Sequence, residues 1–109
     1  MEYYKIQNRH NKDFLGVYCR ESEASFFCAG FSWKDNEWHY KGPYLSDIIH
    51  GFDPYEEDSM WGFHLLDEEA IQISKEEAEE LIGIKIDDEK IEEVIEEGLR
   101  KARENKWKN

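Results

Sequence analysis

The sequence predicts an α+β fold in which an antiparallel β-meander of about four to five strands packs against two C-terminal helices in a single domain. A chain of 109 residues fits one domain, because domains usually hold about 50–200 residues. Fifteen of the sixteen aromatic residues lie between Tyr3 and Phe63. The net charge is −1 over residues 1–52, −15 over residues 53–97 and +4 over residues 98–109. No Gly-, Ser- or Pro-rich linker separates these parts, so the shift indicates a change of secondary structure within one domain.

Four segments near the N-terminus are typical of strands. They cover residues 3–7, 14–20, 26–33 and 38–41. One face of the second segment holds the apolar residues Leu15, Val17 and Cys19. This period of two is typical of a half-buried strand, whereas the third segment is apolar on both faces and favours a central strand. A four-residue turn at residues 34–37 is expected to place Trp33 opposite Trp38.

The pattern changes at Gly42 and Pro43, which break regular structure. Beyond them we expect a short helical turn at residues 45–50, a loop at residues 51–59, and further short strands at residues 60–66 and 70–73. The aromatic-rich β part as a whole covers about residues 1–73, and an acidic helical part covers about residues 74–107.

Two helices are predicted in the acidic part. Ser74 and Glu77 form a capping box at the start of the first helix, Gly83 is a stop signal, and Asp87 is a second cap. The second helix has an apolar stripe with the spacing of an amphipathic helix, formed by Ile91, Val94, Ile95, Gly98, Leu99 and Ala102. Glycine costs about 1 kcal/mol relative to alanine inside a helix, so Gly98 on this stripe indicates close approach of another part of the chain.

Composition excludes several classes of protein. The sixteen aromatic residues argue against disorder, because disordered chains lack the aromatic residues needed to bury a core. No apolar run reaches the ~20 residues that span a bilayer, and the first residues lack a signal-peptide pattern. We therefore expect a soluble, cytoplasmic protein that does not bind membranes. In that compartment Cys19 and Cys28 are expected to be buried thiols, and a redox or disulfide role, which cross-strand proximity would allow, is the alternative.

No catalytic or metal-binding motif is present. The histidines His10, His39, His50 and His64 include no short-spaced pair, and the acidic loop after His50 does not match a calcium-binding pattern. A pairing of Cys19 or Cys28 with His39 in three dimensions is the remaining route to nucleophilic chemistry. We therefore expect a protein that is not an enzyme and that carries no cofactor and no metal.

Direct binding of nucleic acid is disfavoured by the net charge of −12, because affinity for DNA or RNA comes mainly from Lys and Arg on phosphates. The one basic cluster lies near the C-terminus, at Arg100, Lys101, Arg103, Lys106 and Lys108. Its position at the end of a helix is favourable for the helix dipole, and Glu96–Arg100 and Glu97–Lys101 are favourable pairs.

The acidic residues carry the functional hypothesis. Like-charge pairs at i,i+4 such as Glu92/Glu96 destabilise a helix by about 0.2–0.5 kcal/mol, so helix stability does not explain them. We predict a non-catalytic binding protein that inhibits or neutralises a basic nucleic-acid-acting protein, such as a nuclease or CRISPR effector. Phage or mobile-element inhibitors (anti-CRISPR, anti-restriction) and toxin-immunity proteins share this composition.

The predicted partner-binding residues are acidic side chains with two aromatic anchors. They are Asp53, Tyr55, Glu56, Glu57, Asp58, Trp61, Asp67, Glu68, Glu69, Glu76, Glu80, Glu92, Glu93, Glu96 and Glu97. A carboxylate-rich surface of this kind can mimic nucleic acid and steer a basic partner toward it. The alternatives are a small-ligand- or metal-binding domain, or an accessory subunit of a larger complex.

Overall fold

The computed structural model describes residues 1–50 and 67–107, and it contains five strands and three helices in that part of the chain. The strands are β1 (Glu2–Asn8), β2 (Phe14–Arg20), β3 (Ala29–Ser32), β4 (Glu37–Tyr40) and β5 (Glu68–Ile73). The helices are α1 (Tyr44–His50), α2 (Lys75–Ile82) and α3 (Asp88–Trp107). The loop expected at residues 51–59 and the strand expected at residues 60–66 lie outside the described residues.

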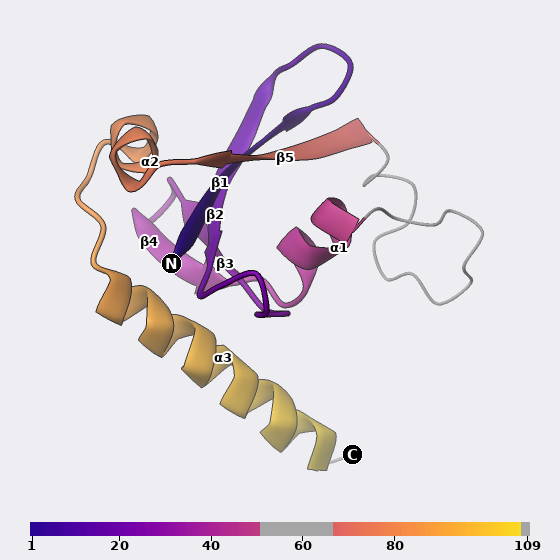
Figure 1. The fold of residues 1–109 in the computed structure, drawn as a ribbon. Helices are drawn as coiled ribbons and strands as arrows, with labels where there is room; N and C mark the ends of the chain where they lie inside the picture. The colour runs from indigo at the N-terminus through magenta and orange to yellow at the C-terminus, as the bar shows by residue number, and fades with distance from the viewer. Residues whose placement is uncertain (51–66, 108–109) are drawn as a thin grey trace.

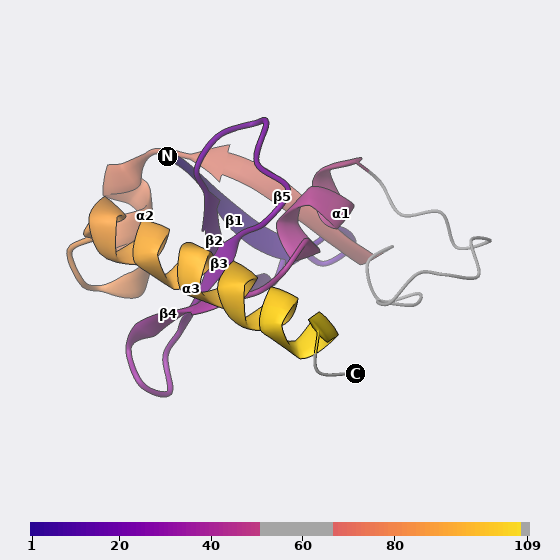
Figure 2. The ribbon, with the colours of Figure 1, turned by 90° about the horizontal axis from the view of Figure 1, so that it is seen from below.

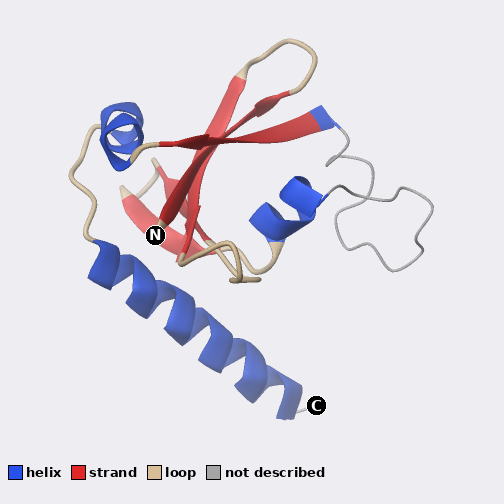
Figure 3. Cartoon of the chain, in the orientation of Figure 1, coloured by secondary structure: helices blue, strands red, loops and turns tan. Residues whose placement is uncertain are grey.

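The strands form one antiparallel sheet in the order β4-β3-β2-β1-β5. Strands β1 to β4 make the predicted meander, and β5 returns to pair with the free side of β1 (Figure 1). Figure 3 shows how the three helices surround this sheet. The structure therefore confirms the α+β prediction and adds the position of β5.

The third strand and the following turn differ from the prediction. β3 covers only Ala29–Ser32, and the turn occupies residues 33–36 instead of 34–37. Asn36 adopts a left-handed φ of 57°, which asparagine tolerates better than most residues, and the turn closes there. As a result Trp38 faces Phe31, with ring centroids 5.5 Å apart, so the predicted pairing of Trp33 with Trp38 is wrong.

Helices α2 and α3 cover one face of the sheet. Figure 2 shows α3 crossing in front of the strands. Buried side chains from β1, β2 and β3 meet buried side chains of the two helices and their connection. This core consists of Tyr3, Val17, Cys19, Ala29, Phe31, Ala78, Ile82, Ile86, Ile91 and Ile95. Leu15, predicted on the same face as Val17, is 47% exposed, because the β1–β2 hairpin projects beyond the helices (Figure 1).

Helix α1 contributes to a second core. It is formed by Tyr4, Ile6, Cys28, Leu45 and Ile48. Neighbouring residues of a strand point to opposite faces of a sheet, so Tyr3 and Tyr4 belong to different cores. Cys19 and Cys28 are likewise divided between the two cores, and both are free thiols.

The predicted helix signals are present. Ser74 Oγ accepts a hydrogen bond from Glu77 N–H at 3.1 Å, and Gly83 ends α2 with a φ of 78°. Asp87 Oδ1 accepts from Glu89 N–H at 3.1 Å at the start of α3. These bonds satisfy backbone groups that would otherwise have no partner at the helix ends.

Gly98 packs against Tyr40, which confirms the close approach predicted from the sequence. A Cβ atom placed on Gly98 would lie 2.5 Å from Tyr40 Cβ, well inside van der Waals contact. Tyr40 belongs to β4, so this contact fixes the separation of α3 from the edge of the sheet.

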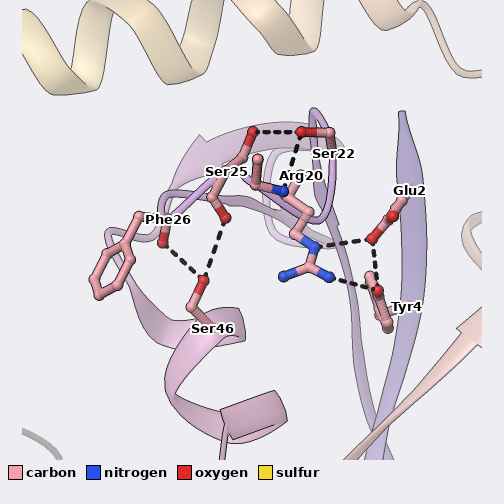
Figure 4. A network of polar contacts seen from close by, with 8 residues as sticks. Glu2, Tyr4, Arg20, Ser22, Ser25, Phe26 and Ser46 are labelled. Atoms are coloured by element: carbon pink, nitrogen blue, oxygen red, sulfur yellow. Dashed lines mark hydrogen bonds and ion pairs between the residues drawn. The ribbon is translucent and has the colours of Figure 1, made fainter.

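A polar network anchors the N-terminus and the segment before β3 (Figure 4). Arg20 is only 5% exposed. Its Nε donates to Glu2 Oε1 at 2.9 Å, and its Nη2 donates to the Tyr4 hydroxyl at 3.0 Å. The Tyr4 hydroxyl donates to Glu2 at 2.6 Å. Nearby, Ser46 Oγ donates to the Phe26 carbonyl at 2.9 Å, which ties α1 to the segment before β3.

We predict that Gly98→Ala lowers the free energy of unfolding by about 1–3 kcal/mol, as overpacking does, although alanine is the better helix former. Urea denaturation measures the change. In a Tyr40→Gly background the collision is absent, and Gly98→Ala is then expected to be stabilising. A destabilisation of equal size in both backgrounds would contradict the proposed contact.

We predict that Glu2→Gln destabilises the protein by about 1–3 kcal/mol at neutral pH, because it leaves the buried Arg20 with a weaker acceptor. The Tyr4 hydroxyl and the Arg20 guanidinium hold the pKa of Glu2 below its usual value. The contribution of the carboxylate is therefore present above the unfolded pKa, near 4.5, and is lost as the pH falls through the lower folded pKa.

Urea denaturation of both proteins across pH 2–7 tests this dependence. The difference between wild type and Glu2→Gln should shrink on acidification. Glu96→Gln is the matched control, because Glu96 is exposed and makes no ion pair with any described residue. A Glu2→Gln effect that is constant with pH would refute the assignment.

Candidate functional site

The acidic residues predicted to bind a partner fall into three groups in the structure. Six of the predicted site residues lie outside the described part of the chain. They are Asp53, Tyr55, Glu56, Glu57, Asp58 and Trp61. The remaining nine occupy the start of β5 and the surfaces of α2 and α3.

The acids at the start of β5 contact other parts of the fold. Asp67 Oδ1 lies 3.2 Å from His10 Nε2. Glu69 accepts from Lys12 Nζ at 2.8 Å and from a buried amide side chain of β1 at 2.6 Å, and these two bonds lower the pKa of Glu69. Glu68 accepts a hydrogen bond from the hydroxyl of a tyrosine in α1. These three carboxylates therefore connect β5 to the β1–β2 hairpin and to α1.

The acids of α2 and α3 that were predicted to bind a partner are exposed. Glu76 and Glu80 lie on the surface of α2. On α3, four exposed glutamates follow the i, i+3, i+4, i+7 spacing, and we call them the acidic stripe: Glu89, Glu92, Glu93 and Glu96. This spacing aligns side chains on one helix face, away from the buried Ile91 and Ile95.

The ion pairs of α3 lie near its two ends, where Lys75 Nζ is 3.6 Å from Asp88 Oδ1 at the N-terminal end. Lys101 Nζ lies 3.3 Å from Glu97 Oε1, and Arg100 Nη2 lies 3.9 Å from the same oxygen. The Glu97–Lys101 pair confirms one pairing expected from the sequence, whereas Arg100 pairs with Glu97. Among the described residues, no cation forms an ion pair with Glu92, Glu93 or Glu96.

A groove of about 500 Å³ separates the β3–β4 turn from α3. Trp38, Ile84 and Val94 form its apolar surface. Charged side chains from both walls border it, and these are Glu37, Lys85, Asp87, Lys90, Glu93 and Glu97. Two of these, Glu93 and Glu97, were predicted from the sequence. Shallower hollows continue along α3 past Gly98 and Lys101.

Sequence reasoning missed the apolar part of this groove. Trp38 was assigned to the sheet without reference to the helix that faces it. Ile84 is an apolar residue in the short polar connection between the two predicted helices, which indicates an exposed apolar contact point. In the structure it is 41% exposed. Glu76 and Glu80 of α2 do not line the groove.

The outer strand of the sheet, β4, contributes its backbone to this region. Just before β3 and just after β4, Lys41 N–H donates to the Cys28 carbonyl and Cys28 N–H donates to the Gly42 carbonyl, both at 3.0 Å. Hydrogen-bonded and non-hydrogen-bonded pairs alternate along an antiparallel ladder. The next hydrogen-bonded pair is therefore that between Gly30 and His39.

The same alternation determines which backbone groups of β4 are unpaired within the sheet. Trp38 and Tyr40 occupy the non-hydrogen-bonded positions opposite β3, so their N–H and C=O groups point away from it. β4 is a terminal strand in the sheet order. The groove is therefore bordered by a strand edge as well as by side chains.

The thiols and histidines do not form a nucleophilic pair in the described structure. Burial raises the pKa of the Cys28 thiol to about 11 and that of Cys19 well above its ordinary value, so both stay protonated at neutral pH. His39 Nε2 lies 2.7 Å from Asp35 Oδ2. Within residues 1–50 and 67–107, no three His, Cys, Asp or Glu side chains converge in a way that could hold a metal ion.

The site and fold together define an α+β protein with an acidic helix face beside an open sheet edge. No protein-family model, curated protein or solved structure matches this chain. In the part of the chain that the structure describes, no helix combines the length and the apolar character needed to cross a bilayer.

We predict that the edge position of β4 appears as an alternation in amide hydrogen exchange. The amides of His39 and Lys41 bond to β3 and should exchange about tenfold or more slowly than those of Trp38 and Tyr40. Residue-resolved exchange by NMR measures this directly. Equal protection of all four amides would show that the outer edge of β4 is covered.

Proposed function

We propose that this protein is a non-catalytic, cytoplasmic acidic binding protein that inhibits or neutralises a basic protein acting on nucleic acid. Phage or mobile-element inhibitors and toxin-immunity proteins are examples of this functional class. The observation that carries the proposal is the acidic stripe, whose exposed carboxylates follow one face of a helix docked on the sheet.

The electrostatics of α3 support this proposal. Glu89 benefits from the positive end of the helix dipole, because it lies in the first turn. Glu92 and Glu96 lie beyond that turn and repel one another at i,i+4, which costs about 0.2–0.5 kcal/mol. A basic partner would remove this repulsion on binding. A rigid row of carboxylates also resembles a row of phosphates in charge, so the binding surface of a nucleic-acid-acting protein is a suitable partner.

The net charge of −12 adds a long-range contribution. The electrostatic field of a strongly charged protein can raise the association rate with an oppositely charged partner by about 10–10³-fold. The acids of β5 contribute to this field, but their carboxylates are engaged within the fold. We therefore assign the contact surface to the described acids of α2 and α3, with those of residues 53–58 as further candidates.

The groove supports a second candidate function, binding of a small ligand. Its volume of about 500 Å³ lies within the usual range for ligand sites, and Trp38 provides an aromatic surface. A thermal-shift panel of small molecules and metal ions distinguishes this alternative. A saturable increase in Tm with one compound would favour it over protein binding.

We predict that Glu92→Lys/Glu96→Lys lowers the association rate with a basic partner by about 10-fold or more at low salt. Partners are first captured on the immobilised wild-type protein and identified by mass spectrometry. Association of each purified partner is then followed by surface plasmon resonance at low and high salt, together with its nucleic-acid activity.

Glu21→Lys/Glu23→Lys is the matched control, because it makes the same charge change at exposed positions before β3. This control should retain most of the association rate. Binding that is insensitive to salt would contradict the proposal. Capture that yields no basic nucleic-acid-acting protein, or an equal loss in the control, would contradict it as well.

A further inference from the structure

We infer that the outer edge of β4 and the groove beside it bind an extended basic peptide segment as an added antiparallel strand. This inference rests on the proposed function in taking the partner to be basic. It adds the part of the partner that is recognised and the backbone geometry of recognition.

The backbone of β4 provides the first requirement. The N–H and C=O groups of Trp38 and Tyr40 point away from β3, as the pairing register requires. Unpaired groups on a terminal strand are a template for another strand. Recognition by strand addition gains affinity from main-chain hydrogen bonds and specificity from pockets for alternate side chains.

The groove provides the second requirement, space for side chains on the α3 side of the sheet. Trp38 and Val94 form apolar walls where side chains of an added strand would lie. Two residues that are hydrogen-bonded to each other across antiparallel strands point their side chains to the same face of the sheet. A peptide residue bonded to the Trp38 backbone would therefore place its side chain beside the Trp38 ring.

Charge identifies the peptide as basic. Carboxylates outnumber ammonium groups four to two around the groove, with Glu37, Asp87, Glu93 and Glu97 against Lys85 and Lys90. A Lys or Arg side chain can lay its aliphatic stem on Trp38, where a cation over the ring face is also favourable. Its charged end can then reach the α3 wall at Glu93, which forms no ion pair with a described residue, whereas Glu97 is paired with Lys101.

The same charges disfavour a second copy of this chain as the occupant of the edge. Two molecules that each carry a net charge of −12 repel one another. Short edge strands with charged side chains are a common protection against self-association. This edge is therefore protected against its own copies while it remains favourable for a cationic strand.

The test uses the full chain labelled with ¹⁵N and a synthetic peptide of alternating lysine and valine, seven residues long, with blocked ends. Two matched control peptides carry N-methyl groups, one on its lysine amides and the other on its valine amides. Each control peptide keeps the charge and the side chains but lacks the backbone N–H donors along one edge of the peptide strand. NMR titration and amide exchange then report Kd and the protection of Trp38 and Tyr40.

We expect the unmodified peptide to slow exchange at Trp38 and Tyr40, and the lysine-methylated peptide to bind about tenfold or more weakly, since it loses hydrogen bonds to β4. The valine-methylated peptide should bind as the unmodified one does. The reverse selectivity would place the lysines away from the carboxylates of α3 and would overturn the inference. Glu93→Lys/Glu97→Lys should weaken binding more than Glu21→Lys/Glu23→Lys.

The inference is overturned if both methylated peptides bind like the unmodified one, if both lose binding, or if no peptide binds at millimolar concentration. Protection of Trp38 and Tyr40 that rises with protein concentration alone would assign the edge to a second copy and also overturn it. Failure of the proposed function gives a result different from failure of this inference. If only the proposed function fails, the peptide still adds to β4, but Glu92→Lys/Glu96→Lys changes the association rate of no basic partner.

Discussion

The docking of α3 on the sheet is the interaction on which the rest of this structure depends. Ile91 and Ile95 are buried against Phe31 and the neighbouring strands, which sets the rotation of the helix about its axis. With those two residues facing inward, the acidic stripe faces outward. Residues that are about half a turn apart along a helix point to opposite sides of it. The exposed carboxylates and the groove are therefore consequences of one apolar contact.

Local signals made much of the fold predictable from the sequence. β2 has the expected bounds, and α2 and α3 have the expected caps at Ser74, Gly83 and Asp87, because such signals act through neighbouring residues. The predicted register of β3 against β4 was wrong, since the register depends on which residue accepts a left-handed conformation in the turn. The position of β5 beside β1 was also missed, because pairing between distant segments leaves little trace in local composition.

The acidic residues show the same division between local and tertiary information. Their number and helical spacing were evident in the sequence, but the sequence did not show whether they form one face. Which carboxylates are used within the fold depends on tertiary contacts such as that between Lys12 and Glu69. The groove required the same information, because its walls come from segments about fifty residues apart, around Trp38 and Val94.

The hydrogen bond from Tyr44 to Glu68 has a consequence for how α1 is held beside β5. It joins the first residue of α1 to the first residue of β5, so two segments that are 24 residues apart in the sequence are held together by a direct contact. The entropy of closing a loop grows slowly, by about 0.6 kcal/mol for each doubling of its length. Closing a span of this length therefore costs little more than closing one half as long, so a single pair of side chains can keep α1 and β5 together.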